Sequence, residues 1–145
     1  MDAFTFLREH VALFAGVSEE HLTGIATGSS VSSFKSGQTI VFKGVTVDAL
    51  HVVCSGSAGV YIKPPNQAIV EVAVLSSGDV FGETSIFENG TAGATIKAKE
   101  DNTFILIIPQ DAFRKLLADS PEFVAQVQAL IAARKKPSGP PKPGT

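Results

Sequence analysis

The chain has 145 residues, of which 44% are hydrophobic and 18% charged, so it is long enough for one domain with a sizeable core. A formal net charge of -2 argues against a general nucleic-acid-binding protein, because such binding depends on clustered lysine and arginine. No apolar run approaches membrane-spanning length, and the lone Cys54 cannot form an internal disulfide. We therefore expect a cytoplasmic protein with no membrane span and no nucleic-acid partner.

The N-terminal segment, residues 3–26, is predicted to be helical because apolar side chains recur at helical spacing from Phe4 to Phe14. We expect a break at Gly16 and a second helix starting at Ser18. Serine is a good N-cap, and two glutamates follow it in the first turn.

From residue 30 to residue 108 the pattern changes to short β-rich runs separated by glycines. The runs are SVSSF, QTIVF, ALHVVCS, GVYIK, AIVEVAVL and TFILIIP. Short strands at regular intervals predict an antiparallel sandwich or jelly roll. The segment 63–66, which contains two prolines, is predicted to be a turn.

Two further helices are predicted after residue 109. Ser120 is expected to cap the last one, with Pro121 at its first position. Its apolar stripe consists of Phe123, Val124, Val127, Leu130 and Ile131. The stripe either packs on the β-core or, if uncovered, forms a homodimer seam or a partner surface. We expect one domain over residues 1–136, followed by a disordered Pro- and Gly-rich tail at 137–145.

A stretch between two predicted strands has the features of an anion site. It reads GDVFGETSIFENGTAGATIKA, and its first strand ends at Phe81-Gly82-Glu83. Glycine lets the backbone turn sharply and approach a ligand closely. The residues from Thr84 onward can start a helical turn, whose free N–H groups suit an anion.

The same stretch resembles the phosphate-binding cassette of the cyclic nucleotide-binding domain family, which includes catabolite activator protein and the regulatory subunits of cyclic-AMP-dependent kinase. The resemblance implies a mainly β fold with flanking helices: a β jelly roll with an N-terminal helical segment and C-terminal hinge and lid helices. Gly82 and Glu83 match the step that binds the ribose 2'-hydroxyl, and the helical turn would bind the cyclic phosphate. Glycines expected at barrel turns are Gly37, Gly44, Gly56, Gly78 and Gly82.

One departure from the family pattern concerns the arginine that pairs with the phosphate, because Ala92 occupies its position. Loss of two charge-assisted hydrogen bonds should cost about 3 kcal/mol or more, roughly a hundredfold in affinity. Residues 64–96 contain four carboxylates and no lysine or arginine. We therefore expect a stand-alone regulatory module with a degenerate phosphate site, without an output domain, that acts through another protein and binds cyclic AMP (cAMP) or cyclic GMP (cGMP) weakly or not at all.

The alternative is a true cyclic nucleotide receptor with a non-standard phosphate site. In that case backbone amides, Thr84 or Ser85, and Arg134 of the lid helix would hold the phosphate. Gly93 stands where a hydroxyl can favour guanine in the family, so base preference stays open. For Arg134, placement at a helix C-terminus has the simpler explanation that cations suit the helix dipole.

Enzymatic activity is not expected. Three scattered histidines, His10, His21 and His51, show no metal-ligand spacing, which disfavours a cupin-type metal enzyme, and no serine lies in a nucleophile elbow. We expect His51 at a strand surface and Cys54 in the core. Lys97 and Lys99 alternate with apolar residues and are expected to be solvated. Neither a catalytic residue nor a cofactor is assigned.

Overall fold

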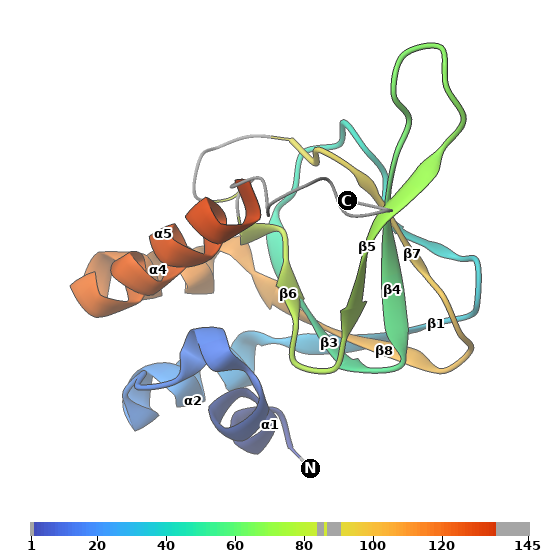
Figure 1. Ribbon diagram of the computed structural model, residues 1–145. Helices are drawn as coiled ribbons and strands as arrows, with labels where there is room; N and C mark the ends of the chain where they lie inside the picture. The colour runs from blue at the N-terminus through green and yellow to red at the C-terminus, as the bar shows by residue number, and fades with distance from the viewer. Residues whose placement is uncertain (1, 84–85, 87–90, 136–145) are drawn as a thin grey trace.

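The computed structural model describes residues 2–83, 86 and 91–135. Three helical segments come first, then eight strands, then two helices (Figure 1). The helical segments are α1 (Ala3–His10), η1 (Ala12–Phe14), α2 (Glu19–Gly28), α4 (Gln110–Asp119) and α5 (Pro121–Lys135). The strands are β1 (Ser30–Phe34), β2 (Thr39–Val41), β3 (Ala49–Ser55), β4 (Ser57–Ile62), β5 (Val70–Ser76), β6 (Val80–Phe81), β7 (Thr95–Ala98) and β8 (Thr103–Pro109).

The strands form two antiparallel four-stranded sheets, which confirms the predicted jelly roll. The helix-side sheet has the order β1-β8-β3-β6, and the outer sheet has the order β2-β7-β4-β5. Helices α2 and α4 pack on β8, and α4 also packs on β3. In Figure 1 the helices accordingly lie together on one side of the barrel, and the outer sheet lies on the other. Among the described residues, the helices therefore cover one sheet of the barrel, and no helix packs on the other.

The apolar stripe of α5 packs within the chain. Phe123 stacks on Phe14 with ring centroids 5.5 Å apart and meets Phe113 edge-on at 5.6 Å. Val127 is 0% exposed and Ile131 6%. The residues that cover this stripe belong mainly to η1 and α4 rather than to the strands. Phe123, Val127 and Ile131 are therefore covered within the chain, by helical segments rather than by the predicted β-core, whereas Val124 and Leu130 are partly exposed. A homodimer through α5 stays a prediction.

Strand bounds agree closely with the sequence patterns, whereas the N-terminal helix does not. SVSSF, ALHVVCS and TFILIIP have the predicted ends. Helix α1 ends at His10, well before Gly16, because the buried Val11 adopts an extended conformation (φ -117°, ψ 105°). The predicted cap at Ser18 is confirmed, since its hydroxyl accepts a hydrogen bond from the His21 N–H at 3.2 Å.

The five glycines predicted at barrel turns all have positive φ angles, between 78° and 95°. Gly78 also allows a close approach, because a Cβ there would overlap the carbonyl oxygen of His10. The end of α1 therefore rests directly on the turn between β5 and β6, which fixes the N-terminal helices relative to the barrel.

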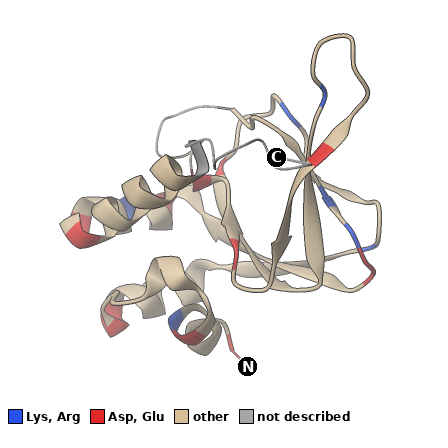
Figure 2. Cartoon of the chain, viewed as in Figure 1, with Lys and Arg blue, Asp and Glu red and all other residues tan. Residues whose placement is uncertain are grey.

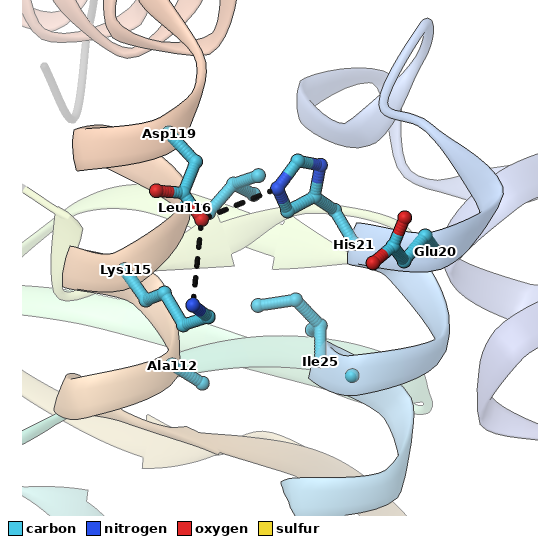
Figure 3. A pocket seen from close by; sticks show the side chains of 8 residues that line it. Glu20, His21, Ile25, Ala112, Lys115, Leu116 and Asp119 are labelled. Carbon is cyan, nitrogen blue, oxygen red and sulfur yellow. Dashed lines mark hydrogen bonds and ion pairs between the residues drawn. The ribbon is translucent and has the colours of Figure 1, made fainter.

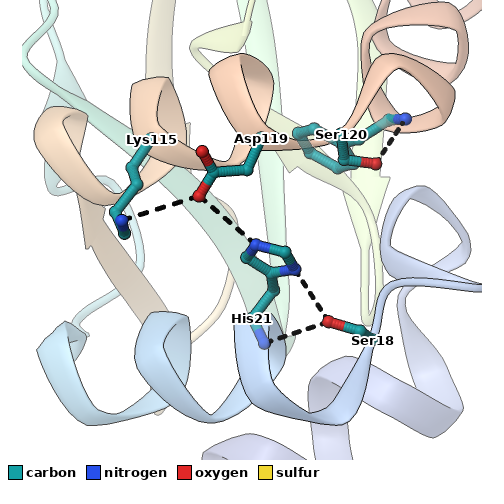
Figure 4. A network of polar contacts seen from close by, with 6 residues as sticks. Ser18, His21, Lys115, Asp119 and Ser120 are labelled. Carbon is teal, nitrogen blue, oxygen red and sulfur yellow. Dashed lines mark hydrogen bonds and ion pairs between the residues drawn. The ribbon is translucent and has the colours of Figure 1, made fainter.

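A polar network fastens α2 to α4 (Figure 4). His21 Nδ1 lies 2.7 Å from the Ser18 hydroxyl, and His21 Nε2 lies 3.3 Å from Asp119 Oδ2, which Lys115 Nζ also approaches at 3.5 Å. Beside this network is a shallow groove of about 230 Å³ with charged rims and a floor that includes Ile25 (Figure 3).

Positively and negatively charged residues both occur in the helices and in the barrel (Figure 2). On the outer sheet, Lys99 Nζ pairs with Glu71 Oε1 at 2.5 Å, and the Tyr61 hydroxyl lies 3.3 Å from the same oxygen. Lys97 Nζ lies 5.8 Å from the centroid of the Tyr61 ring. The predicted surface position is confirmed for Lys99, which is exposed, and Lys97 is partly exposed. Both lysines also make specific contacts on the outward face.

Candidate ligand site

The backbone of the cassette is shaped by Gly82. Strand β6 ends at Phe81, and Gly82 follows with φ of 95°. A Cβ at Gly82 would lie 2.9 Å from the Ala49 carbonyl oxygen and 3.2 Å from Val47 Cγ1. The Ile86 N–H then donates to the Gly82 carbonyl at 3.2 Å, which closes a helical turn. The predicted sharp turn is therefore present, and it needs glycine both for its conformation and for space.

Glu83 is buried at the start of this turn, with 1% of its surface exposed. Charged side chains are seldom buried to this extent unless other groups compensate the charge. Ile86, on the same turn, is also 1% exposed. The cassette thus directs its acidic side chain into the protein, where the family resemblance puts a ribose ligand.

Three of the proposed ligand residues cannot be placed. Thr84 and Ser85 lie outside the described residues, as does the predicted tail at 137–145. The backbone of Arg134 belongs to α5, but its side chain lies outside the described part of the structure.

Ala92 belongs to the hydrophobic core. It is 8% exposed, and its backbone is held on both sides: its N–H donates to the Val45 carbonyl at 2.9 Å, and its carbonyl accepts from the Gly44 N–H at 2.8 Å. The next residue, Gly93, is exposed, and apart from its own chain neighbours no atom of the described residues would lie within 4 Å of a Cβ built on it. A buried methyl group therefore stands at the position that the sequence resemblance predicts to align with the family's phosphate-binding arginine.

A guanidinium from another element reaches the cassette, and sequence reasoning missed it. Arg114 of α4 donates from Nη2 to the Ile86 carbonyl at 3.0 Å. With the Gln110 amide oriented so that its oxygen faces the guanidinium, this oxygen accepts from Arg114 Nε at 2.6 Å and Nη2 at 2.9 Å. The sequence analysis considered Arg134 of the lid helix as a cation for this site but not Arg114, because no local pattern marks an arginine 28 residues beyond Ile86 as a neighbour of the cassette.

His51 lies next to Gly82 and is partly buried, so the expectation of a surface histidine is wrong. It is half-buried, and its ring stacks on Phe81 with centroids 4.8 Å apart and planes 9° apart. A Cβ on Gly82 would lie 3.6 Å from His51 Nδ1. Burial lowers the pKa of His51, while the Ala49 backbone and the charge of Asp48 act in the opposite direction.

Metal-ligating and nucleophilic groups are sparse. Among the described residues, no group of three or more His, Cys, Asp or Glu side chains could hold a metal ion. Cys54 is only half-buried, at the margin of the core, and burial raises the pKa of its thiol, which keeps it protonated and weakly reactive. No helix in the described part of the chain combines the length and the apolar character needed to cross a membrane.

These features define a helix-flanked β jelly roll with a Gly-Glu helical turn between β6 and β7. The family model described as "Cyclic nucleotide-binding domain" matches residues 31–120, so the chain belongs to the cyclic nucleotide-binding domain family. This membership confirms the resemblance seen in the sequence and the expected fold.

Regulatory proteins are among the relatives. A CRP-like cAMP-activated global transcriptional regulator of Mycobacterium tuberculosis is 27% identical over 124 residues, covering 84% of this chain and 54% of the regulator. A cGMP-dependent protein kinase (isozyme 1) of Drosophila melanogaster is 29% identical over 120 residues, covering 81% of this chain and 16% of the kinase. The catabolite activator protein of Thermus thermophilus superposes with a TM-score of 0.74 at 26% identity, over 84% of this chain and 57% of that structure. This chain thus spans about half the length of the first regulator and a small part of the kinase.

Proposed function

We propose that this protein is a regulatory module of the cyclic nucleotide-binding type with a degenerate phosphate site, which acts through contact with another protein. The observation that carries the proposal is Ala92, a core methyl group at the arginine position. A methyl group offers no donor to a phosphate, and the deficit of two charge-assisted hydrogen bonds is about 3 kcal/mol or more. Cyclic nucleotides would then bind weakly or not at all.

The expected mode of action is regulatory and cytoplasmic rather than catalytic. The relatives reported above include a transcriptional regulator and a cGMP-dependent protein kinase, and this chain aligns with only part of each of them. A module of this kind transmits its state through a bound protein.

A second function is favoured by two observations in the cassette, namely the buried Glu83 and the contact of Arg114 with Ile86. Here the protein is a receptor for cAMP or cGMP with a non-standard phosphate site. Glu83 binds the ribose hydroxyl, and the turn amides with Arg114 compensate the phosphate charge. Arg114 supports this alternative better than Arg134, because its guanidinium already touches the cassette.

Calorimetric titration of the purified chain with cAMP and cGMP separates the two functions. Absence of heat up to millimolar ligand supports the degenerate module, whereas micromolar binding refutes it. If the site is degenerate, Ala92→Arg should create cyclic nucleotide binding or strengthen weak binding by about a hundredfold. If the wild type binds, Glu83→Gln and Arg114→Gln should each weaken binding at least about tenfold, and an unchanged affinity in both would reject the receptor geometry.

A further inference from the structure

The four sheet edges of the barrel differ in how they are protected. Strands β2 and β6 are edges of three and two residues, too short to template a partner strand. The β5 edge carries Glu71, and its pairing with β4 shifts register between Val60 and Tyr61. Short strands, bulges and charges are the usual devices against edge-to-edge pairing. Three of the four edges therefore have such a device.

The β1 edge has none of these devices. Its five residues, SVSSF, contain no charge and no proline, and they pair with β8 without a register shift. Within the described residues, β1 is the terminal strand of the helix-side sheet. No backbone group elsewhere in the described part of the chain pairs with this edge, so it presents donors and acceptors in a regular array that can accept another strand.

Exposed apolar side chains lie next to this edge. Val31 is 56% exposed and Phe104 39%. Val31 is paired with Leu106 and Ser33 with Phe104, so these side chains share the face of the sheet on which, further along, the helices pack. The apolar surface of this face thus continues past the helices as far as the edge.

We propose that β1 pairs in antiparallel fashion with β1 of a second copy of this chain, about a twofold axis at Ser32. In this register Ser30 faces Phe34 of the second copy, and Val31 faces its Ser33. Each bulky side chain meets a serine, and no charge faces another charge. The two helix-side sheets then form one continuous eight-stranded sheet. The second copy is the favoured occupant because the five-residue edge is complementary to itself in size and charge.

The same register covers the exposed apolar residues. Ser33 lies between Phe104 on one side and Val31 of the second copy on the other, so the long Phe104 side chain can reach across the serine to that valine. The twofold symmetry repeats this contact, so two pairs, each of Phe104 and the Val31 of the other copy, are removed from water. Pairing through β1 does not use the buried α5 stripe or the cassette, and it is independent of the proposed function.

Sedimentation equilibrium of the full chain tests the pairing. The wild type should show a concentration-dependent approach to twice its 15.1 kDa mass. Val31→Lys should raise the dimer dissociation constant about tenfold or more, because it places charge at the edge and removes the apolar contact. Val74→Lys is the matched control, because Val74 is 50% exposed and lies on the bulged β5 edge. This variant should change the dimer dissociation constant less than about twofold.

A double variant tests the register itself. Val31→Lys combined with Ser33→Glu sets opposite charges at facing positions twice across the axis, so it should regain most of the lost association. A wild type that stays at 15.1 kDa up to millimolar concentration overturns the proposal. Equal weakening by the Val31 and Val74 variants, or no recovery in the double variant, overturns it as well.

Discussion

Gly82→Ala is expected to destabilise the protein strongly through the backbone of the cassette. Holding a side chain at φ of 95° costs about 1–2 kcal/mol. The new Cβ would also lie 2.9 Å from the Ala49 carbonyl oxygen, a backbone atom of β3 that cannot move aside easily, and 3.2 Å from Val47 Cγ1. Relief of such overpacking costs about 1–3 kcal/mol. The free energy of unfolding should therefore fall by about 2–5 kcal/mol, which corresponds to a decrease in Tm on the order of 10 °C.

Urea unfolding followed by circular dichroism measures this change. The matched control is Gly93→Ala, in the same stretch, where φ lies outside the left-handed region. Beyond its chain neighbours, no described residue has an atom within 4 Å of the added methyl group. The control should stay within about 0.5 kcal/mol of the wild type. If Gly82→Ala were as stable as Gly93→Ala, the close approach of the cassette to β3 would not exist in solution.

Four further outcomes are expected. Gly24→Ala, in an open part of α2, should raise the free energy of unfolding by about 0.5–1 kcal/mol in urea, and a decrease would contradict the open surface. Phe123→Ala should lower it by about 3–5 kcal/mol in the same assay, because the ring packs between Phe14 and Phe113. Since burial lowers the pKa of His51, the unfolded state binds more protons below pH 6.5, so stability should be lost as pH falls through and below this value; a pH series in which His51→Phe shows the same loss would exclude His51 as its cause. Arg114→Met should speed amide hydrogen exchange at Ile86, and unchanged exchange would mean that the contact with α4 does not restrain the turn.

The sequence was sufficient for the barrel because its signals are local. Alternating apolar runs and glycines at turns depend on adjacent residues, and three strands have the predicted bounds. Gly82 and Ala92 could be recognised in the same way, as positions within one continuous motif. The helix break at Val11 was missed because a buried apolar residue fits the helical spacing as well as it fits an extended link.

The rest of the site depends on contacts between distant segments. Arg114 reaches Ile86 from a helix that follows all eight strands, and His51 stacks on Phe81 through pairing of β3 with β6. Neither contact leaves a periodic signal in the sequence. The same limitation applied to Val127, whose neighbours are determined by the docking of α5 on η1 and α4.

The Tyr61 network on the outer sheet also provides a spectroscopic probe. The chain contains one tyrosine and no tryptophan, so near-ultraviolet emission arises essentially from a single phenol. This phenol lies against Glu71 and Lys97 on the outer sheet, whereas β1 and β6 belong to the helix-side sheet. Its signal therefore reports on the integrity of the outer sheet, and it can be recorded without an added label while a ligand or a second copy is titrated.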